Sequence, residues 1–214
     1  MLKSVAKLYI IDGDPAMRQW FGALALSMQL CPKPFASPPE FLEHCTPSEP
    51  GCVLLDVRPP GVSALELLDC MRRWVIPFPV IVVSVYGDVR TAVRAMRAGA
   101  LFFFEKPCRQ HELEEAIREA IRCDAENRRR LARKRRLHQR LAKLNTGERA
   151  VLDRVLEGIG NKEIATELGL TIRTIEARRA KIMDKMKADS LAELIRMTLE
   201  ATVLGEESQP LFPR

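Results

Sequence analysis

The sequence predicts an α/β domain with a doubly wound, five-stranded parallel sheet, followed by a long linker helix and an all-α, four-helix domain. Three observations predict this order. Short apolar runs alternate with helical segments over the first half of the chain. Neither Pro nor Gly occurs between Gln110 and Asn145, and only helical periodicity follows. A chain of 214 residues is long enough for two such domains.

The predicted strands are short and apolar throughout, which is typical of parallel strands that are buried on both faces. They are Lys7–Ile11, a weaker run near Pro34–Phe35, Cys52–Leu55, Val80–Ser84 and Leu101–Phe104. The segments Ala64–Trp74 and Val89–Ala98 have helical spacing, and the second one stops at Gly99. This alternation predicts right-handed crossovers between parallel strands.

A single helix is predicted from Gln110 to Asn145, and four shorter helices follow it. Gly169 is the expected turn between two of them, Asn161–Leu168 and Thr171–Met186. The predicted N-caps are Asn161, Thr171 and Ser190. The predicted core positions of the helix pair are Ile164, Leu168, Ile172, Ile175 and Ile182. We expect domains at 1–122 and 144–205, a basic linker helix at 123–143 and a flexible tail at 206–214.

Positive charge is concentrated in the middle of the chain. The whole chain carries +6, and residues 123–143 alone hold nine Lys/Arg against two Asp/Glu. Residues 1–122 are balanced, and residues 144–214 have a net charge of −1. A basic block of this kind attracts a polyanion such as DNA. The alternative is a solvated helix face between domains, and for Arg128–Arg136 we expect mainly solvation with some contribution to DNA binding.

The sequence contains no membrane or export signal that we can identify. No apolar run reaches the roughly 18 residues of a membrane span, and the N-terminal apolar run leads directly into acidic residues without a cleavage site. None of the six cysteines forms a CxxC pair. We therefore expect a cytoplasmic protein with reduced thiols and no membrane partner.

Polar side chains follow the predicted strands where the strands end. They are Asp12 and Asp14, Asp56, Ser84 and Lys106. Ligand chemistry in open parallel sheets gathers at the carboxyl ends of the strands, so we expect these groups to converge. A carboxylate there can accept a phosphoryl group when a cation offsets the charge, and Mg²⁺ prefers oxygen ligands.

Four segments make the first half resemble the receiver domain of two-component response regulators. They are IDGD at 11–14, LLDVRPPG at 54–61, VSVYGD at 83–88 and EKP at 105–107. The resemblance implies that Asp56 accepts the phosphoryl group and that Mg²⁺ is held by Asp12, Asp56 and the backbone carbonyl of Arg58. It also implies a switch hydroxyl at Ser84, a switch aromatic at Phe103 and a phosphate-contacting lysine at Lys106.

This receiver-like segment departs from the family pattern at the metal site. Gly13 stands where the family has a second acidic ligand, so we expect weak Mg²⁺ binding. Asp14 is a further candidate ligand, although it lies on a different side of the chain. These departures leave open a receiver that works without phosphorylation. A second alternative is a haloacid-dehalogenase-like phosphatase that uses Asp12 and Asp14, but we find no later acidic pair after Lys106 that would hold its metal.

Residues 144–204 resemble the LuxR-type, or NarL/FixJ, DNA-binding domain. The segment NKEIA at 161–165 carries the resemblance, together with Leu144, Glu148, Leu168 and Thr174. The resemblance implies that Thr171–Met186 is a recognition helix that enters the major groove. The candidate DNA contacts are Lys162, Thr171, Arg173, Thr174, Glu176, Ala177, Arg178, Arg179, Ala180, Lys181 and Lys185. Arg178 replaces the usual His, and Glu148 is expected to be a structural partner.

Together the two resemblances imply a FixJ-type response regulator and no enzyme. The expected function is transcription regulation, in which phosphorylation of Asp56 controls dimerisation and DNA binding. The implied partners are double-stranded DNA, a sensor histidine kinase and a second copy of the chain, and RNA polymerase is a further candidate.

Overall fold

The computed structural model describes residues 5–57, 63–74, 76–85 and 88–206, with side chains as far as Ala201. The chain folds as two compact units, and the boundary between them lies between Arg128 and Arg129. We call them the N-terminal unit and the C-terminal unit and describe each by itself.

The N-terminal unit contains a five-stranded parallel sheet, as the sequence predicts. Its strand order is β2-β1-β3-β4-β5. The strands are β1 (Lys7–Ile11), β2 (Cys31–Phe35), β3 (Gly51–Asp56), β4 (Val80–Ser84) and β5 (Phe102–Glu105). Because β1, β3, β4 and β5 are neighbours, their carboxyl ends form a continuous edge.

Strand β2 is longer than the sequence predicts, and its prolines explain why. Pro32 and Pro34 interrupt the apolar pattern and cannot donate to a hydrogen-bond ladder. They are tolerated because β2 lies at the edge of the sheet and pairs only with β1. The bounds of β1 and β4 agree with the prediction, and β3 begins one residue early at Gly51.

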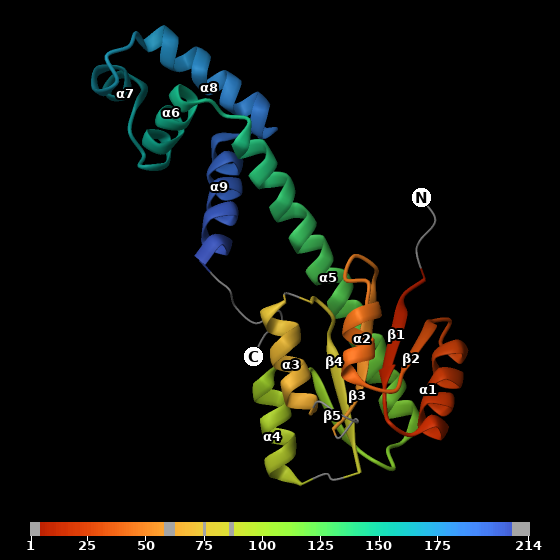
Figure 1. Ribbon diagram of the computed structural model, residues 1–214. Helices are drawn as coiled ribbons and strands as arrows, with labels where there is room; N and C mark the ends of the chain where they lie inside the picture. The colour runs from red at the N-terminus through yellow and green to blue at the C-terminus, as the bar shows by residue number, and fades with distance from the viewer. Residues whose placement is uncertain (1–4, 58–62, 75, 86–87, 207–214) are drawn as a thin grey trace. The chain divides into compact units, whose positions relative to one another are not determined.

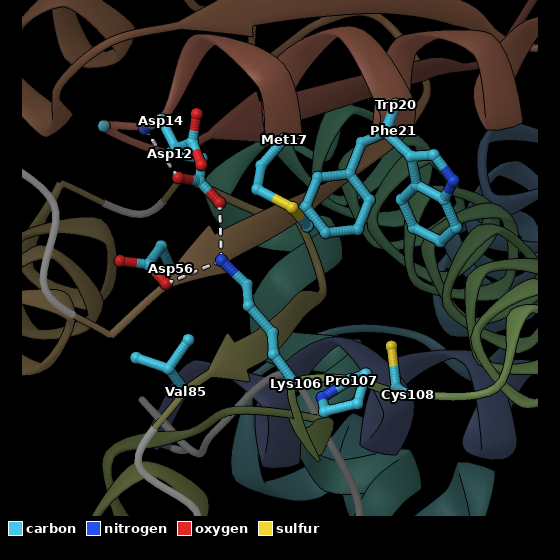
Figure 2. A pocket seen from close by; sticks show the side chains of 11 residues that line it. Asp12, Asp14, Met17, Trp20, Phe21, Asp56, Val85, Lys106, Pro107 and Cys108 are labelled. Carbon is cyan, nitrogen blue, oxygen red and sulfur yellow. Dashed lines mark hydrogen bonds and ion pairs between the residues drawn. The ribbon is translucent and has the colours of Figure 1, made fainter.

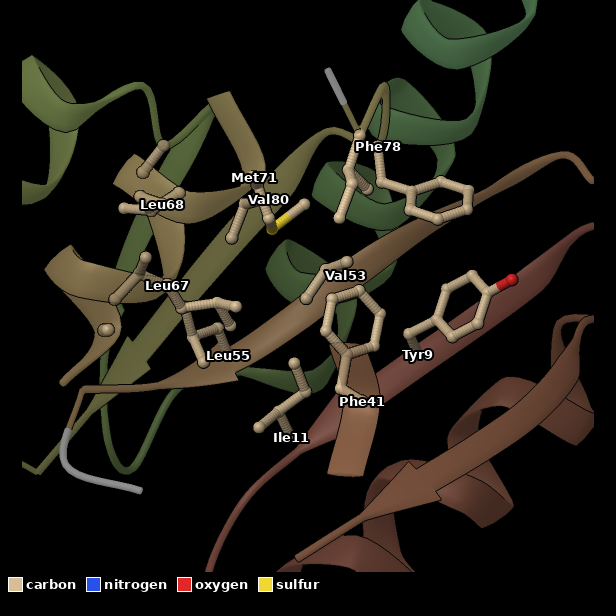
Figure 3. Close-up of a cluster of buried hydrophobic side chains, with 14 of the residues drawn as sticks. Tyr9, Ile11, Phe41, Val53, Leu55, Leu67, Leu68, Met71, Phe78 and Val80 are labelled. Carbon is tan, nitrogen blue, oxygen red and sulfur yellow. The ribbon is translucent and has the colours of Figure 1, made fainter. Parts of the chain in front are cut away.

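Helices cover both faces of this sheet (Figure 1). Alternate residues of each strand point to opposite faces, so the two faces bury different side chains. On one face, β1, β3 and β4 pack against α2 (Pro38–His44), α3 (Ala64–Arg73) and α4 (Val89–Ala98). Figure 3 shows this cluster around Tyr9, Val53 and Phe41. On the other face, α1 (Pro15–Ser27) and the start of α5 (Gln110–Ala142) pack on Leu8, Leu54 and Ile81.

Helix α4 ends at Gly99, as predicted. Gly99 has a φ of 105°, a left-handed conformation that glycine adopts at little cost. The apolar positions of α4 face solvent, since Val89 is 80% exposed and Met96 is 47% exposed. The only residue of α4 in the unit's core is Ala95. This helix therefore presents an apolar surface that the N-terminal unit does not bury.

Helix α5 runs without interruption from Gln110 to Ala142, three residues short of the predicted end. Its first half contributes Leu113, Ile117 and Ala120 to the core of the N-terminal unit. Near its end, Leu137 belongs to the core of the C-terminal unit. One helix thus supplies core residues to both units.

The expectation of a solvated basic face is wrong for Arg128. Its Nε donates to Asp124 Oδ2 at 2.7 Å, and its Nη1 donates to the Pro47 carbonyl at 2.9 Å. The guanidinium also lies 5.6 Å from the centre of the Phe78 ring. Asp124 is fully buried and accepts from the Gly51 amide at 3.0 Å. A tertiary partner therefore draws Arg128 into the N-terminal unit.

The C-terminal unit is helical, as predicted. It contains the end of α5 followed by α6 (Thr146–Leu156), α7 (Asn161–Glu167), α8 (Ile172–Met186) and α9 (Leu191–Glu206). Gly169, with a φ of 64°, makes the turn between α7 and α8. Thr171 caps α8 and Ser190 bonds the amide of Glu193, which confirms two of the predicted caps.

Two predictions for this unit are wrong. Gly160, not Asn161, is the N-cap of α7, and Asn161 instead accepts a hydrogen bond from Arg179 Nη1 at 2.6 Å. Ile172 is 45% exposed rather than buried. It is the first residue of α8, and the apolar stripe of that helix extends one turn beyond the core, which begins at Ile175.

Candidate functional site

Two carboxylates and a lysine meet at the carboxyl edge of the sheet. Asp12 follows β1, Asp56 ends β3, and Lys106 follows β5. Lys106 Nζ donates to Asp12 Oδ2 at 2.7 Å and to Asp56 Oδ1 at 3.0 Å (Figure 2). The strand-end argument therefore located these three groups correctly. Ser84 ends β4 between them in the strand order and is buried.

The Lys106 ammonium remains protonated in this environment. Burial alone would lower the pKa of Lys106, but the hydrogen bonds to Asp12 and Asp56 outweigh burial, and the pKa is raised above 10.5. Asp12 is itself only 3% exposed, so its carboxylate oxygens need hydrogen-bond donors from the protein. Its Oδ1 accepts from the Asp14 amide at 2.9 Å, and its Oδ2 accepts from Lys106.

Asp14 has a structural role at the start of α1. It is the N-cap of that helix, and its Oδ1 accepts from the Ala16 amide at 2.8 Å. Its side chain is exposed and lines the same cavity as Asp12 and Asp56. Gly13, between the two, adds no side chain to the pocket.

These residues fit a magnesium ion with few protein ligands. Mg²⁺ in proteins usually keeps several waters and takes one or two carboxylates together with phosphate oxygens. Asp12 and Asp56 supply two carboxylates that face one cavity of about 800 Å³. Over the described ranges no cluster of three or more His, Cys, Asp or Glu side chains is placed to hold a metal. Arg58, the third expected ligand, lies outside the described residues.

The switch candidates lie on β4, which is next to the strand that ends in Asp56, and on β5, the strand after it. Ser84 is 1% exposed, and Phe103, on β5, is partly buried against the core that α3 and α4 cover. In the sheet register, Asp56 lies opposite Val83 and Ser84 lies opposite Glu105. A change at Asp56 can therefore reach Phe103 through one intervening strand.

The candidate DNA contacts divide into two groups. Seven have exposed side chains in the C-terminal unit, and all but the first belong to α8 or cap it. They are Lys162, Thr171, Arg173, Glu176, Ala177, Ala180 and Lys181. The exposed members offer charge and hydrogen-bonding groups to a partner without a rearrangement of the fold.

The other four candidates are partly buried and already have partners inside the unit. Arg178 Nη1 donates to the Gly147 carbonyl at 3.2 Å, and Arg179 donates to Asn161. Thr174 Oγ1 lies 2.8 Å from Thr171 Oγ1. Lys185 Nζ donates to both carboxylate oxygens of Glu148, at 2.8 and 2.6 Å.

Glu148 is a structural residue, as expected. It is 2% exposed, and with Asn145 it forms a capping box at the start of α6. The hydrogen bond from Lys185, with that from the Asn145 amide, lowers the pKa of Glu148 below 4.5. This carboxylate ties α6 to α8 and so holds the exposed helix in place.

Both halves of the chain match families of known proteins. Residues 8–118 match the response regulator receiver domain, and residues 142–198 match the bacterial regulatory proteins of the luxR family. The chain is 40% identical to the transcriptional regulatory protein FixJ of Azorhizobium caulinodans, over 92% of this chain and 93% of FixJ. The chain belongs to the FixJ/NarL family of response regulators.

Other relatives are similar to this response regulator over most of the length of both chains. TodT, a response regulator protein of Pseudomonas putida, is 37% identical over 89% of the chain and 84% of TodT. The structure of the response regulator StyR matches with a TM-score of 0.82 at 32% identity, over 91% of this chain and 98% of StyR. Full-length FixJ from B. japonicum matches with a TM-score of 0.56 at 37% identity, over 92% of the chain and 98% of FixJ.

The family settles the class of this response regulator. It is a transcriptional regulator of a two-component system with a receiver and a DNA-binding domain, which implies DNA and a sensor kinase as partners. Receiver domains generally bind Mg²⁺ at the phosphorylation site. The Asp12-Gly13-Asp14 segment follows β1 of a receiver domain, so the match does not support the phosphatase alternative. None of the described helices is long and apolar enough to cross a membrane.

Sequence reasoning missed the apolar side of the pocket in this response regulator. Met17, Trp20 and Phe21 of α1 line the cavity that contains the acids, and so do Pro107 and Cys108 (Figure 2). The helical spacing of positions 17, 20 and 21 was the available signal, since such residues share one face. The Lys106–Pro107 peptide bond on the opposite side is cis.

Proposed function

We propose that phosphorylation of Asp56 controls dimerisation and DNA binding by this response regulator. The observation that carries the proposal is the placement of Asp56, Asp12 and Lys106 around one cavity at the carboxyl edge of the sheet. A nucleophilic carboxylate lies there beside a protonated lysine, which can offset the charge of a bound phosphoryl group.

The phosphoryl group comes from a phosphohistidine of a sensor histidine kinase. An Asp56 carboxylate oxygen attacks phosphorus and forms the new P–O bond. The P–N bond breaks, and the histidine nitrogen retains the electron pair. Mg²⁺, when bound, offsets negative charge on the phosphoryl oxygens. Asp12, Asp56 and the Arg58 backbone carbonyl would hold it, with Asp14 as a further candidate, and Gly13 makes its binding weak.

Lys106, Ser84 and Phe103 convert phosphorylation into a change of conformation. Lys106 currently bridges Asp12 and Asp56, so a phosphoryl group on Asp56 must change these hydrogen bonds. Ser84 turns towards the new phosphoryl oxygens, and Phe103 follows on the next strand. The β4–β5 edge of the sheet is thereby coupled to α4.

The dimer forms through the apolar surface of α4. Val89 is 80% exposed and Val93 is 43% exposed, and Val85 before the helix is 59% exposed. Contiguous exposed apolar side chains of this kind mark interaction surfaces. A two-fold dimer pairs the same surface of both copies and matches two DNA half-sites.

Helix α8 reads the DNA sequence from the major groove. Among its exposed side chains, Arg173 suits guanine, Glu176 can accept from cytosine, and Ala177 and Ala180 permit close approach. Arg179 also lies on or near this face, although it is bonded to Asn161. Lys162, Thr171, Thr174, Arg178, Lys181 and Lys185 are proposed for the phosphates. Bound dimers would then act on RNA polymerase.

A phosphorylation assay tests this proposal. The full chain is incubated with Mg²⁺ and acetyl phosphate, and its intact mass, its size in solution and its DNA affinity are measured in parallel. We expect a mass increase of one phosphoryl group that is absent in Asp56→Asn, together with dimer formation and tighter DNA binding. The second candidate, a regulator that ignores phosphorylation, is favoured by Gly13. It predicts a DNA-binding protein with no mass increase.

A further inference from the structure

Helix α8 is tied to the first turn of α6 at two points. Lys185 donates to the carboxylate of Glu148, and Arg178 Nη1 donates to the Gly147 carbonyl at 3.2 Å. The two helices lie side by side in the C-terminal unit (Figure 1). The carboxylate of Glu148 offsets the charge of Lys185, whereas a backbone carbonyl has no net charge. The bond to Gly147 therefore holds the guanidinium of Arg178 in place without compensating its positive charge.

Glycine at position 147 leaves the space that this guanidinium occupies. A Cβ atom at Gly147 would lie 2.7 Å from Arg178 Nη1, 2.9 Å from Cζ and 3.2 Å from Nη2. Nonbonded heavy atoms prefer separations of about 3.5–4.0 Å, so a side chain and the guanidinium cannot both fit. The three atoms form the far end of one flexible side chain, so an added methyl group would displace the guanidinium rather than the backbone.

Arg178 lies at the border between the exposed face of α8 and α6. Thr174, Arg178, Lys181 and Lys185 recur at helical spacing and so share one side of α8. In a helix that enters the major groove, a side row of this kind faces the phosphates. A guanidinium has five N–H donors in a fixed fork. The donors that the Gly147 carbonyl does not use are therefore available to a phosphate oxygen.

We propose that Gly147 is a positioning residue for DNA binding, which fixes the guanidinium of Arg178 in the orientation that contacts a DNA phosphate. The inference rests on the proposed role of Arg178 as a phosphate contact and adds the residue that orients it. A long side chain that is ordered before binding loses less entropy in the complex. This saving corresponds to about three- to ten-fold in affinity.

The salt dependence of DNA affinity tests the positioning role. Each full-length variant is titrated into a labelled duplex of mixed sequence at several salt concentrations, because phosphate contacts do not depend on sequence. Gly147→Ala should weaken binding about three- to ten-fold and reduce the slope of log affinity against log salt by about 1. Arg178→Ala should have effects of the same size. A change that only lowers stability would leave the slope as it is.

Combined variants separate positioning from general damage. Gly147→Ala should weaken binding no further in the Arg178→Ala background, because the side chain that needs the space is gone. In the Arg178→Lys background, where a slimmer ammonium replaces the guanidinium, it should change affinity by less than about two-fold. Gly22→Ala is the matched control, since a Cβ atom at this position of α1 would meet nothing within 4 Å. It should leave affinity and slope unchanged.

NMR relaxation of arginine side-chain N–H groups tests the same idea without a change at position 147. In the free protein, the guanidinium of Arg178 should be more ordered than that of the exposed Arg173. Equal mobility of the two groups would overturn the proposal, whether or not Gly147→Ala folds stably.

The binding data can also overturn it. Equal weakening by Gly147→Ala with and without Arg178, or an unchanged salt slope in Gly147→Ala, would show that the glycine does not act through Arg178. If Gly147→Ala has no effect while Arg178→Ala weakens binding, only the positioning role fails. If Arg178→Ala has no effect either, the assignment of Arg178 to phosphates fails as well. Phosphorylation of Asp56 is tested separately by the mass measurement.

Discussion

Gly13 is the residue that most distinguishes this acidic site from that of its family. It removes one carboxylate from a metal site that retains Asp12 and Asp56. Asp14 does not simply replace it, since that side chain caps α1. We therefore expect a site that keeps Asp56 and Lys106 but binds Mg²⁺ weakly.

An acidic residue at position 13 should therefore increase the affinity of the site for Mg²⁺. Gly13→Asp adds a carboxylate beside Asp12, and we expect Mg²⁺ to bind about ten-fold tighter, a change of roughly 1.4 kcal/mol. Isothermal titration calorimetry with Mg²⁺ measures the effect. Adding Asp56→Asn to the same variant should remove most of the gain. An unchanged dissociation constant in Gly13→Asp would contradict this account of the site.

Glu148 makes the C-terminal unit sensitive to acid. Its pKa is lowered in the folded protein, chiefly by the hydrogen bond from Lys185, so its ionised form stabilises the fold. This contribution is fully present above the ordinary pKa of 4.5. It is lost as the pH falls through the lowered pKa of the folded state.

Hydrogen exchange in Glu148→Gln checks the pH dependence. At pH 7 the variant should lose protection in α6 and α8 severalfold relative to the unsubstituted chain, because Lys185 loses its partner. The difference should shrink as the pH is lowered below 4. Asp153→Asn, an exposed acid of the same helix, is the matched control and should show no difference at either pH.

At the scale of elements, the sequence predicts the strands and the long helix well, but not how α5 is held. Apolar runs and the absence of Pro and Gly are local signals, which is why β1, β4 and α5 were found. The hydrogen bond from the Gly51 amide to Asp124 joins residues 73 positions apart, and no local sequence pattern predicts it. The ion pair between Glu148 and Lys185 could not be predicted for the same reason, because its two residues are also far apart in the sequence.

The α4 surface shows a second limit of sequence reasoning. Helical spacing places Val89, Val93 and Met96 on one face, and a stripe of this kind ordinarily indicates the face that packs on a core. In the N-terminal unit that face is exposed. Periodicity identifies a buried surface but does not say whether the same chain or a partner covers it.

Removing Asp124 should destabilise the N-terminal unit strongly. Asp124→Ala leaves the partly buried Arg128 without its carboxylate partner, so we expect the free energy of unfolding to fall by about 2–4 kcal/mol. Trp emission during urea unfolding measures it, since both tryptophans lie in this unit.

Two further variants separate the ion pair from general damage. In the double variant Asp124→Leu/Arg128→Leu, the loss in free energy of unfolding should be smaller than the sum of the losses in the two single Leu variants. The reason is that the double variant leaves neither charge buried without its partner. Arg129→Ala, the exposed neighbour in the basic run, should change stability by less than about 0.5 kcal/mol. Additive losses in the double variant would count against a coupled pair.

At the scale of the whole molecule, the charge available to DNA is smaller than the composition suggests. Arg128, Arg178, Arg179 and Lys185 are all bonded within their own unit. The exposed cations Lys162, Arg173 and Lys181 remain accessible. Among the lysines proposed for the phosphates, Lys162 and Lys181 are therefore expected to contribute more than Lys185, which is paired with Glu148.

Salt dependence tests whether the exposed Lys181 contacts DNA phosphates. Lys181→Ala should weaken DNA binding across all sequences and reduce the slope of log affinity against log salt by about 1. Arg154→Ala removes a cation that is paired with Glu167 at 2.6 Å and should leave the slope unchanged. Fluorescence anisotropy with a labelled duplex at several salt concentrations gives both slopes. Equal slopes for all three proteins would place Lys181 outside the interface.

Gly51 has a consequence for which sequences this fold accepts. A Cβ atom at position 51 would lie 2.6 Å from the backbone oxygen of Lys7, whereas one at Gly22 would meet nothing within 4 Å. The amide of Gly51 is also the donor that Asp124 requires. Strand β1 cannot move away from position 51 without breaking its pairing with β3. A larger residue at position 51 would therefore clash with β1 and would also disturb the hydrogen bond to Asp124. We therefore expect related sequences to keep Gly at position 51, whereas position 22 has room for at least a Cβ atom.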